Sequence, residues 1–232
     1  MMYSPIRPIV TDTGIVVIGV SDSSPSIKTG FSSLISHFGV ARDLRAALSY
    51  RNEKQIELIA PSTSSFTNTI ISPNLSIDIV DSKDCQRFSG VIINNITVGE
   101  SPSFIKNKLM ALGLKPINNI VDITNYVMHE IGQPLHAYDR NKISSNTIKI
   151  QKLKKGTKFT TLDGIERELG DNDLMICDDN TPMCLAGVFG GNFHGVSENT
   201  TSIFLESAFF NPVSVRKSAK YHSLNTDSSY RF

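Results

Sequence analysis

Apolar residues recur at helical spacing through the middle of the chain. Between residues 117 and 131 they lie three, four or seven positions apart, at Ile117, Ile120, Val121, Val127, Met128 and Ile131. Pro116 has the φ of a first helical turn and Gly132 ends the run, so the pattern predicts a helix over 116–131. Ser101, followed by Pro102, predicts the N-cap of a preceding helix that closes at Gly113.

Other segments alternate or are rich in β-branched residues, which is typical of strands. The predicted strands are 15–20, 75–80, 88–98, 147–152, 158–162, 173–177 and 203–206. Helical spacing also predicts a helix over 34–48, and Asn211-Pro212 predicts a last helix that runs to Tyr221.

Helices that cluster in one stretch and strands that cluster in another favour an α+β fold, with mixed, mostly antiparallel sheets and packed helices. Residues 61–74 are rich in Ser, Thr, Asn and Pro and are predicted to form a loop. We therefore expect an N-terminal segment, 1–74, with a strand and a helix, and a larger module, 75–232.

Composition narrows the classes of protein. With 232 residues, 40% of them hydrophobic, the chain can bury a substantial core, and a net charge of +1 indicates no global attraction to a polyanion. The three cysteines do not have the even count or close pairing of a disulfide framework or zinc site, so a reduced, cytoplasmic setting and no metal are expected. No apolar run is long enough to cross a membrane.

Basic residues nevertheless gather locally. One run without Asp or Glu contains Lys142, Lys149, Lys152, Lys154, Lys155 and Lys158, and the predicted last helix carries Arg216, Lys217 and Lys220. Such clusters can contact nucleic acid, although any single lysine is more often part of a solvated surface.

Several residues are candidates for a site, each with a structural alternative. Thr124 lies on the apolar stripe, where its hydroxyl can bond back to its own helix. Glu206 ends a strand-like run among apolar neighbours, so it is either an exposed strand-end charge or a perturbed buried carboxylate. Gly187-Val-Phe-Gly-Gly191 can bring backbone close to a ligand or form a flexible turn. His136 follows a restricted Gln133-Pro-Leu135 segment and is either structural or held against a substrate.

The stretch Gly113-Leu-Lys-Pro-Ile-Asn-Asn-Ile-Val-Asp-Ile-Thr-Asn-Tyr-Val-Met128, followed by Gly132-Gln-Pro-Leu-His-Ala-Tyr-Asp139, resembles the editing module of bacterial phenylalanyl-tRNA synthetase beta subunits. The resemblance continues, in order, through Thr161-Leu-Asp-Gly164, Leu185-Ala-Gly-Val-Phe-Gly-Gly191, Leu205-Glu-Ser-Ala-Phe-Phe-Asn-Pro212 and Leu224-Asn-Thr-Asp-Ser-Ser-Tyr-Arg-Phe232. Separated motifs in the right order are far more specific than any single one. The last motif continues beyond this end in the family, so a fragment is expected.

The resemblance implies a role for each matching residue. Three match positions that act on the ester or hold the terminal adenosine or a water, namely His136, Thr124 and Asn125. The substrate-binding positions match Glu206, Gly187, Gly190, Thr226 and Ser228, and the last of these is usually alanine in the family. The glutamate is implied to recognise the hydroxyl of tyrosine. A second, polar site is needed because the apolar pocket that selects phenylalanine for attachment rejects an added hydroxyl only weakly.

The implied function is hydrolysis of tyrosyl-tRNA(Phe) within the class II enzyme that attaches phenylalanine to tRNA(Phe). No catalytic triad, activated cysteine, metal cluster or phosphate-binding loop is evident, so attack by a positioned water is expected, with backbone amides of 187–191 as candidate oxyanion donors. The implied partners are tRNA(Phe) and the alpha subunit, in an alpha2beta2 assembly. No cofactor is expected in this piece, whereas ATP and Mg serve the whole enzyme.

Two alternatives remain open from the sequence. The chain could be a non-catalytic module that binds RNA or supports subunit assembly, which the matching site residues disfavour. It could also be a free-standing deacylase, for which a complete chain with a natural end would be expected.

Overall fold

The computed structural model describes residues 15–18, 36–53, 55–60, 63–66 and 75–232. Parts of the predicted strand 15–20, helix 34–48 and loop 61–74 lie outside these residues. The described helices are α1 (His37–Asn52), α2 (Ser103–Ala111), α3 (Asn119–Ile131), the short 3-10 helix η1 (Arg140–Lys142), α4 (Pro212–Tyr221) and α5 (Asp227–Arg231). The described strands are β1 (Ile15–Ile18), β2 (Ser76–Ile79), β3 (Cys85–Asn94), β4 (Leu135–Asp139), β5 (Thr147–Lys152), β6 (Lys158–Thr160), β7 (Glu166–Glu168), β8 (Leu174–Asp178), β9 (Thr181–Leu185), β10 (Phe189–Gly190) and β11 (Ser202–Phe210).

The strands form two larger sheets and one small one. The first sheet has the order β1-β3-β11-β4 and is antiparallel throughout. The second has the order β10-β9-β8-β5-β2, in which only β2 and β5 run parallel, and β6 pairs with β7 in a separate hairpin. The α+β class with mostly antiparallel sheets is therefore confirmed. The division at residue 74 stays a prediction; β1, from the N-terminal segment, pairs with β3.

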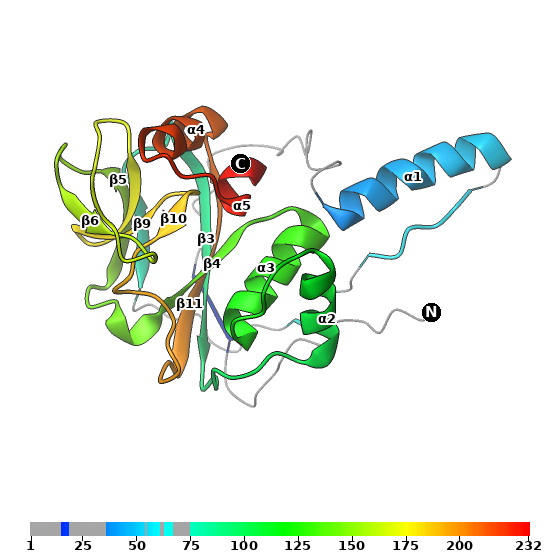
Figure 1. Cartoon of the computed structure of the whole chain (residues 1–232), viewed down its shortest axis with the longest axis horizontal. Helices are drawn as coiled ribbons and strands as arrows, with labels where there is room; N and C mark the ends of the chain where they lie inside the picture. Colours follow the sequence, from blue (N-terminus) through cyan, green and yellow to red (C-terminus); the bar gives the residue numbers. More distant parts are fainter. Residues whose placement is uncertain (1–14, 19–35, 54, 61–62, 67–74) are drawn as a thin grey trace.

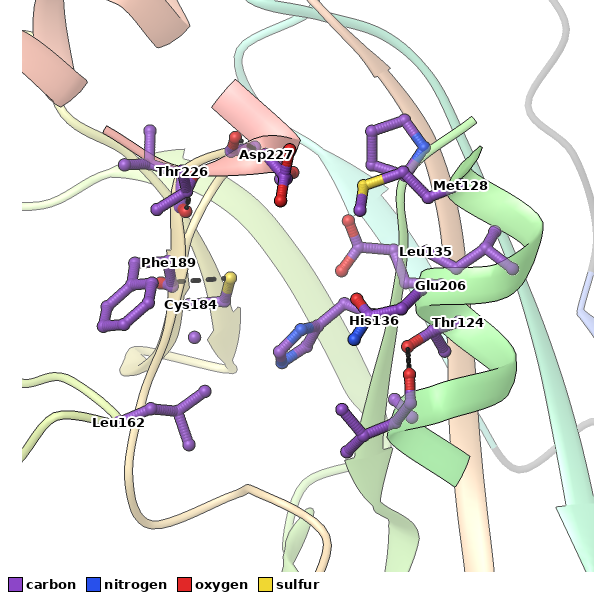
Figure 2. Close-up of a pocket in the computed structure, with 18 of the residues that line it drawn as sticks. Thr124, Met128, Leu135, His136, Leu162, Cys184, Phe189, Glu206, Thr226 and Asp227 are labelled. Carbon is purple, nitrogen blue, oxygen red and sulfur yellow. Dashed lines mark hydrogen bonds between the residues drawn. The ribbon is translucent and has the colours of Figure 1, made fainter. Parts of the chain in front are cut away.

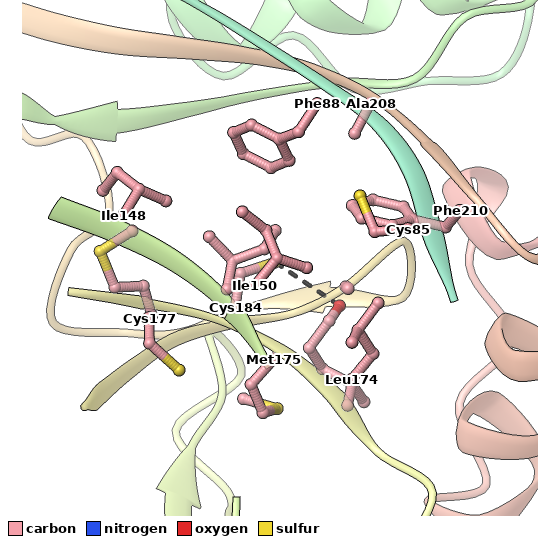
Figure 3. Close-up of a cluster of buried hydrophobic side chains, with 14 of the residues drawn as sticks. Cys85, Phe88, Ile148, Ile150, Leu174, Met175, Cys177, Cys184, Ala208 and Phe210 are labelled. Carbon is pink, nitrogen blue, oxygen red and sulfur yellow. Dashed lines mark hydrogen bonds between the residues drawn. The ribbon is translucent and has the colours of Figure 1, made fainter. Parts of the chain in front are cut away.

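Figure 1 shows β3, β4 and β11 at the centre, with β5, β6, β9 and β10 on one side and α2 and α3 on the other. The main core fills the space between the two larger sheets. Figure 3 shows Phe88 and Phe210 of the first sheet facing Ile150 and Met175 of the second, and these side chains are at most 1% exposed. A smaller apolar cluster joins α2 to α3. The helix α1 extends away from the sheets.

Local capping explains where the helices begin. The predicted N-cap at Ser101 is wrong: Pro102 occupies that position, and the Ser101 hydroxyl donates instead to the buried Asp122 carboxylate at 2.5 Å. The predicted start at residue 116 is also too early. The Asn118 side chain accepts the N–H groups of Ile120 and Val121, so α3 begins only at Asn119.

The remaining element predictions agree with the structure to differing degrees. The strand 147–152 and the helix from residue 212 to Tyr221 are confirmed, with Asn211 as the N-cap of the latter. Gly132 ends α3 with a φ of 85°. Six of the described elements were not predicted, namely β4, η1, β7, β9, β10 and α5.

Candidate functional site

A single cavity of about 340 Å³ brings all eight predicted site residues together. Its walls come from α3, β4, the β9–β10 hairpin, β11 and α5. Figure 2 shows His136 between Thr124 on one side and Leu162 and Phe189 on the other, with Thr226 and Asp227 above. The predicted residues that line it are Thr124, Asn125, His136, Gly187, Gly190, Glu206, Thr226 and Ser228.

The pairing of β4 with β11 sets the centre of the cavity. In this ladder His136 lies opposite Glu206, and Tyr138 lies opposite Phe204. Alternate residues of a strand share a face, so all four side chains project from the same side of the sheet. Glu206 therefore lies in the middle of β11, which continues to Phe210, and the alternative of a strand-end charge is wrong.

Glu206 is a buried carboxylate at the cavity wall. It is 5% exposed, and the phenol of Tyr138 donates a hydrogen bond to its Oε2 at 2.6 Å. Burial raises the pKa of Glu206 to about 7, while the Tyr138 hydrogen bond acts in the opposite direction. A carboxylate held in this way is a strong acceptor for a hydroxyl that enters the cavity.

His136 presents a neutral imidazole beside Glu206. Removal from bulk water lowers its pKa to about 4. The ring packs edge-on against Tyr138, with centroids 4.5 Å apart, and a Cβ at Gly190 would lie only 2.6 Å from its Cε1 atom. Because Gly190 has no side chain, the imidazole of His136 can occupy this space. At neutral pH the ring can donate from one nitrogen and accept at the other, as is required to orient a water.

The short helix α5 closes the cavity above His136. Gly187 has a φ of 70°, and a Cβ there would meet other side chains at 2.9 Å. The Thr226 hydroxyl donates to the carbonyl of Val188 at 2.9 Å, and the Ser228 hydroxyl donates to that of Gly187 at 3.2 Å. Both hydroxyl protons are thus engaged with backbone, which attaches α5 to the turn before β10.

Thr124 and Asn125 differ in what they offer to a ligand. The Thr124 hydroxyl donates to the Val121 carbonyl at 2.7 Å, as the structural alternative predicts, yet Thr124 also lines the cavity and its oxygen can still accept. Within the described part of the chain, the Asn125 amide has no hydrogen-bond partner, so it is free to bind a ligand.

Fewer backbone amides of residues 187–191 are available as oxyanion donors than the sequence predicted. The N–H of Val188 donates to the Leu185 carbonyl at 2.9 Å, and that of Gly191 donates to the Met183 carbonyl at 2.8 Å. These two amides are therefore occupied by the turn itself. Gly191 does not line the cavity.

The lysine run is largely neutralised by carboxylates distant in the sequence. Lys142 donates to the carbonyl of Gly195. Four more lysines make ion pairs of 2.5 to 3.3 Å, namely Lys149 with Asp179, Lys152 with Asp84, Lys155 with Asp171 and Lys158 with Glu166. The run is therefore not a continuous positive surface. Arg216, Lys217 and Lys220 are exposed on α4, the helix that precedes α5.

Several lining residues carried no signal in the sequence. Leu162, Phe189 and Met128 supply apolar wall, and Cys184 lies near Glu206. Burial raises the pKa of the Cys184 thiol well above its ordinary value, and the thiol contacts the Phe189 carbonyl at 3.4 Å, so it is not an activated nucleophile. All three cysteines are free and buried. The described residues contain no cluster of three or more His, Cys, Asp or Glu side chains suited to a metal ion, and no described helix is long and apolar enough to cross a membrane.

Comparison with known proteins gives a consistent result. Residues 84–232 match the model of the B3/4 domain family. Phenylalanine–tRNA ligase beta subunits from Porphyromonas gingivalis and Bacteroides fragilis are 55% and 50% identical over 198 and 197 residues, and that from Aquifex aeolicus is 46% identical over 199 residues. These alignments cover 85%, 85% and 86% of this chain, but in each case 24% of the relative.

The chain thus spans about a quarter of the length of the curated relatives it matches. A solved N-terminal fragment of the phenylalanyl-tRNA synthetase beta subunit from Pyrococcus horikoshii is 14% identical with a TM-score of 0.45, covering 85% of this chain and 59% of that one. The family match and the high-identity relatives agree with the resemblance in the motifs. The chain therefore belongs to the B3/4 domain family, in the form present in phenylalanine–tRNA ligase beta subunits.

Proposed function

We propose that this chain is the editing module of a phenylalanine–tRNA ligase beta subunit and hydrolyses the tyrosyl ester of mischarged tRNA(Phe). The observation that carries the proposal is the pairing of His136 with the buried Glu206 in one cavity. A volume of about 340 Å³ is in the range of small-ligand sites.

Selectivity follows from the chemistry of Glu206. An aryl ring would pack against apolar wall such as Phe189 and Leu162, and a phenolic hydroxyl would donate to the carboxylate. A phenylalanyl ring leaves the carboxylate oxygen that Tyr138 does not bind desolvated and without a partner. A site built to bind a hydroxyl can reject the analogue that lacks it by roughly 10⁴-fold or more.

Hydrolysis in this proposal is attack by a positioned water. The neutral His136 ring orients the water, and the free Asn125 amide holds the ester end or the terminal ribose. Thr226, Ser228 and the two glycines shape the wall that fixes the substrate. Positioning of this kind supplies a large part of the rate of many hydrolytic reactions.

The wider assembly belongs to the same proposal. The relatives are ligase subunits, so we place this module in an enzyme with tRNA(Phe) and an alpha subunit as partners. The attachment of phenylalanine, with ATP and Mg, takes place outside this chain.

One observation favours a second role in assembly. Helix α1 exposes Val40, Leu44 and Leu48 at a spacing of four residues, which forms an apolar stripe. A partner domain that covers this stripe is compatible with editing by the cavity.

The test is deacylation of tyrosyl-tRNA(Phe), with phenylalanyl-tRNA(Phe) as control substrate. We expect the native chain to hydrolyse the tyrosyl ester selectively. The rate of this hydrolysis should fall by about 10- to 100-fold in Glu206→Ala and strongly in His136→Ala. Glu130→Ala is the matched control, because Glu130 also accepts a tyrosine hydroxyl, from Tyr126 at 2.8 Å, but outside the cavity.

Equal hydrolysis of both esters would overturn the proposed selectivity. If the folded chain hydrolyses neither, the assay is repeated with the heteromeric ligase that carries the same substitutions. Unchanged editing by the Glu206→Ala and His136→Ala ligases would exclude this cavity as the site.

A further inference from the structure

Tyr138 lies behind the cavity wall and contacts the two residues at its centre. Its side chain is fully buried and does not line the cavity. The hydroxyl donates to Glu206 Oε2 at 2.6 Å, and the ring packs edge-on against His136 and stacks on Phe204 at 6.0 Å. A single side chain thus contacts both Glu206 and His136.

The sheet register sets this arrangement. Tyr138 lies two residues after His136 on β4, so the two share a face, and the phenol reaches diagonally across to Glu206 on β11. Glu206 Oε1 has no hydrogen-bond partner in the described part of the chain. The Tyr138 bond therefore leaves one carboxylate oxygen for a ligand.

The other groups around Glu206 do not stabilise its charge. The titratable neighbours are the imidazole of His136 on β4 and the thiols of Cys184 on β9 and Cys85 on β3. One further carboxyl, that of Asp227 on α5, lines the same cavity. No lysine or arginine is among the described residues that line the cavity. Burial raises the pKa of Glu206, and the hydrogen bond from Tyr138 lowers it.

We propose that Tyr138 is the positioning residue that sets the specificity of this cavity, by holding Glu206 as an oriented carboxylate with one free oxygen. The ligand class it selects is an aminoacyl ester whose aryl ring carries a hydrogen-bond donor in the para position. A ring whose para oxygen is methylated offers no donor and is rejected, as is an unsubstituted ring. The inference rests on the proposed editing function.

The test compares Tyr138→Phe with Tyr126→Phe in the full chain. Both substitutions remove a tyrosine hydroxyl that donates to a glutamate, but the bond from Tyr126 to Glu130 is only partly buried and lies outside the cavity. The first readout is the titration of the Glu206 carboxyl by ¹³C NMR, with the resonance assigned through Glu206→Gln. Tyr138→Phe is expected to move the midpoint to higher pH, and Tyr126→Phe to leave it in place.

The second readout is kcat/KM for the tyrosyl and phenylalanyl esters as a function of pH. If the midpoint rises by about one unit, tyrosyl deacylation falls about eightfold near pH 6.5 but only about twofold near pH 8, because Glu206 ionises again. A merely structural role lowers the rate equally at every pH. In the Glu206→Gln background, Tyr138→Phe is expected to leave the pH profile unchanged.

The outcomes separate the inference from the function on which it rests. A native chain that hydrolyses tyrosyl-tRNA(Phe) selectively, with the same pH profile and selectivity after Tyr138→Phe, overturns the role of Tyr138 alone. A native chain and ligase that never hydrolyse the tyrosyl ester overturn the proposed function, and the inference with it. A shifted carboxyl midpoint together with pH-dependent loss of selectivity supports both.

Discussion

Replacing Glu206 by Gln removes the charge at the centre of the cavity and keeps the shape of the side chain. The folded protein raises the pKa of this carboxyl from 4.5 to about 7, because burial disfavours the charged form more than the Tyr138 hydrogen bond favours it. Between these values the folded chain binds one more proton at this site than the unfolded chain does. The contribution of Glu206 to stability is therefore fully present below about pH 4.5 and is lost as the pH rises through 7.

The size of the effect follows from the shift. A rise from 4.5 to about 7 corresponds to roughly 3 kcal/mol of unfolding free energy. Gln cannot ionise, so Glu206→Gln is expected to gain about 3 kcal/mol relative to the native chain between pH 4 and pH 8. The lowered pKa of His136 gives the opposite slope, but it acts in both proteins and cancels to first order in the difference.

The measurement is urea unfolding of both proteins at a series of pH values. The chain contains no tryptophan, so far-UV circular dichroism is the suitable probe. A difference in unfolding free energy that stays constant with pH would refute the argument that Glu206 is a buried, perturbed carboxylate. A difference of the opposite sign at high pH would show that its charge is stabilised by the fold.

Three further substitutions test individual contacts. Gly190→Ala places a Cβ 2.6 Å from the His136 ring, so we expect deacylation to fall about 100-fold with a small change in melting temperature. Gly187→Ala combines a φ of 70° with contacts at 2.9 Å, and calorimetry should show a loss of about 1–3 kcal/mol. Burial raises the pKa of Asp178, but hydrogen bonds, including those from Ser144, outweigh this effect and lower it. Asp178→Asn weakens these bonds. Its destabilisation, about 1–3 kcal/mol by urea unfolding, should shrink as the pH falls below 3.8.

Matched variants make these predictions specific. The Cβ of Gly99→Ala would enter open space, so this variant is the control for Gly190→Ala. Gly164 has a positive φ but open space around its Cβ position, so Gly164→Ala isolates the backbone cost in Gly187→Ala. Full activity of Gly190→Ala, or equal losses for Gly187→Ala and Gly164→Ala, would contradict the predicted clashes. An Asp178→Asn loss that grows in acid would contradict the assigned direction of its pKa.

Local chemistry allowed several elements to be predicted from the sequence. The start of α4 at Asn211-Pro212 and the end of α3 at Gly132 depend on neighbours within a few residues. The strand 147–152 is indicated by its own alternating pattern. One cap was mispredicted because the partner of its side chain lies far away in the sequence. Ser101 was expected to cap the next helix, but Asp122, 21 positions away, accepts its hydroxyl instead.

The elements that were missed depend on distant partners. Strands β9 and β10 are short and exist because they pair with each other and with β8, and α5 has only five residues. Such segments carry little periodic pattern. Their stability comes from contacts that no local window of sequence contains.

The sequence by itself determined which residues to consider, because ordered motifs identify the eight site residues through family resemblance. The tertiary structure decided their environment. Tyr138 and Glu206 are 68 positions apart, yet their contact and burial determine the state of the carboxylate. Likewise, nothing in the stretch that contains the lysine run indicates which carboxylates pair with it, because those carboxylates lie elsewhere in the sequence. Desolvation and charge pairing are properties of three-dimensional neighbours, so only folding establishes them.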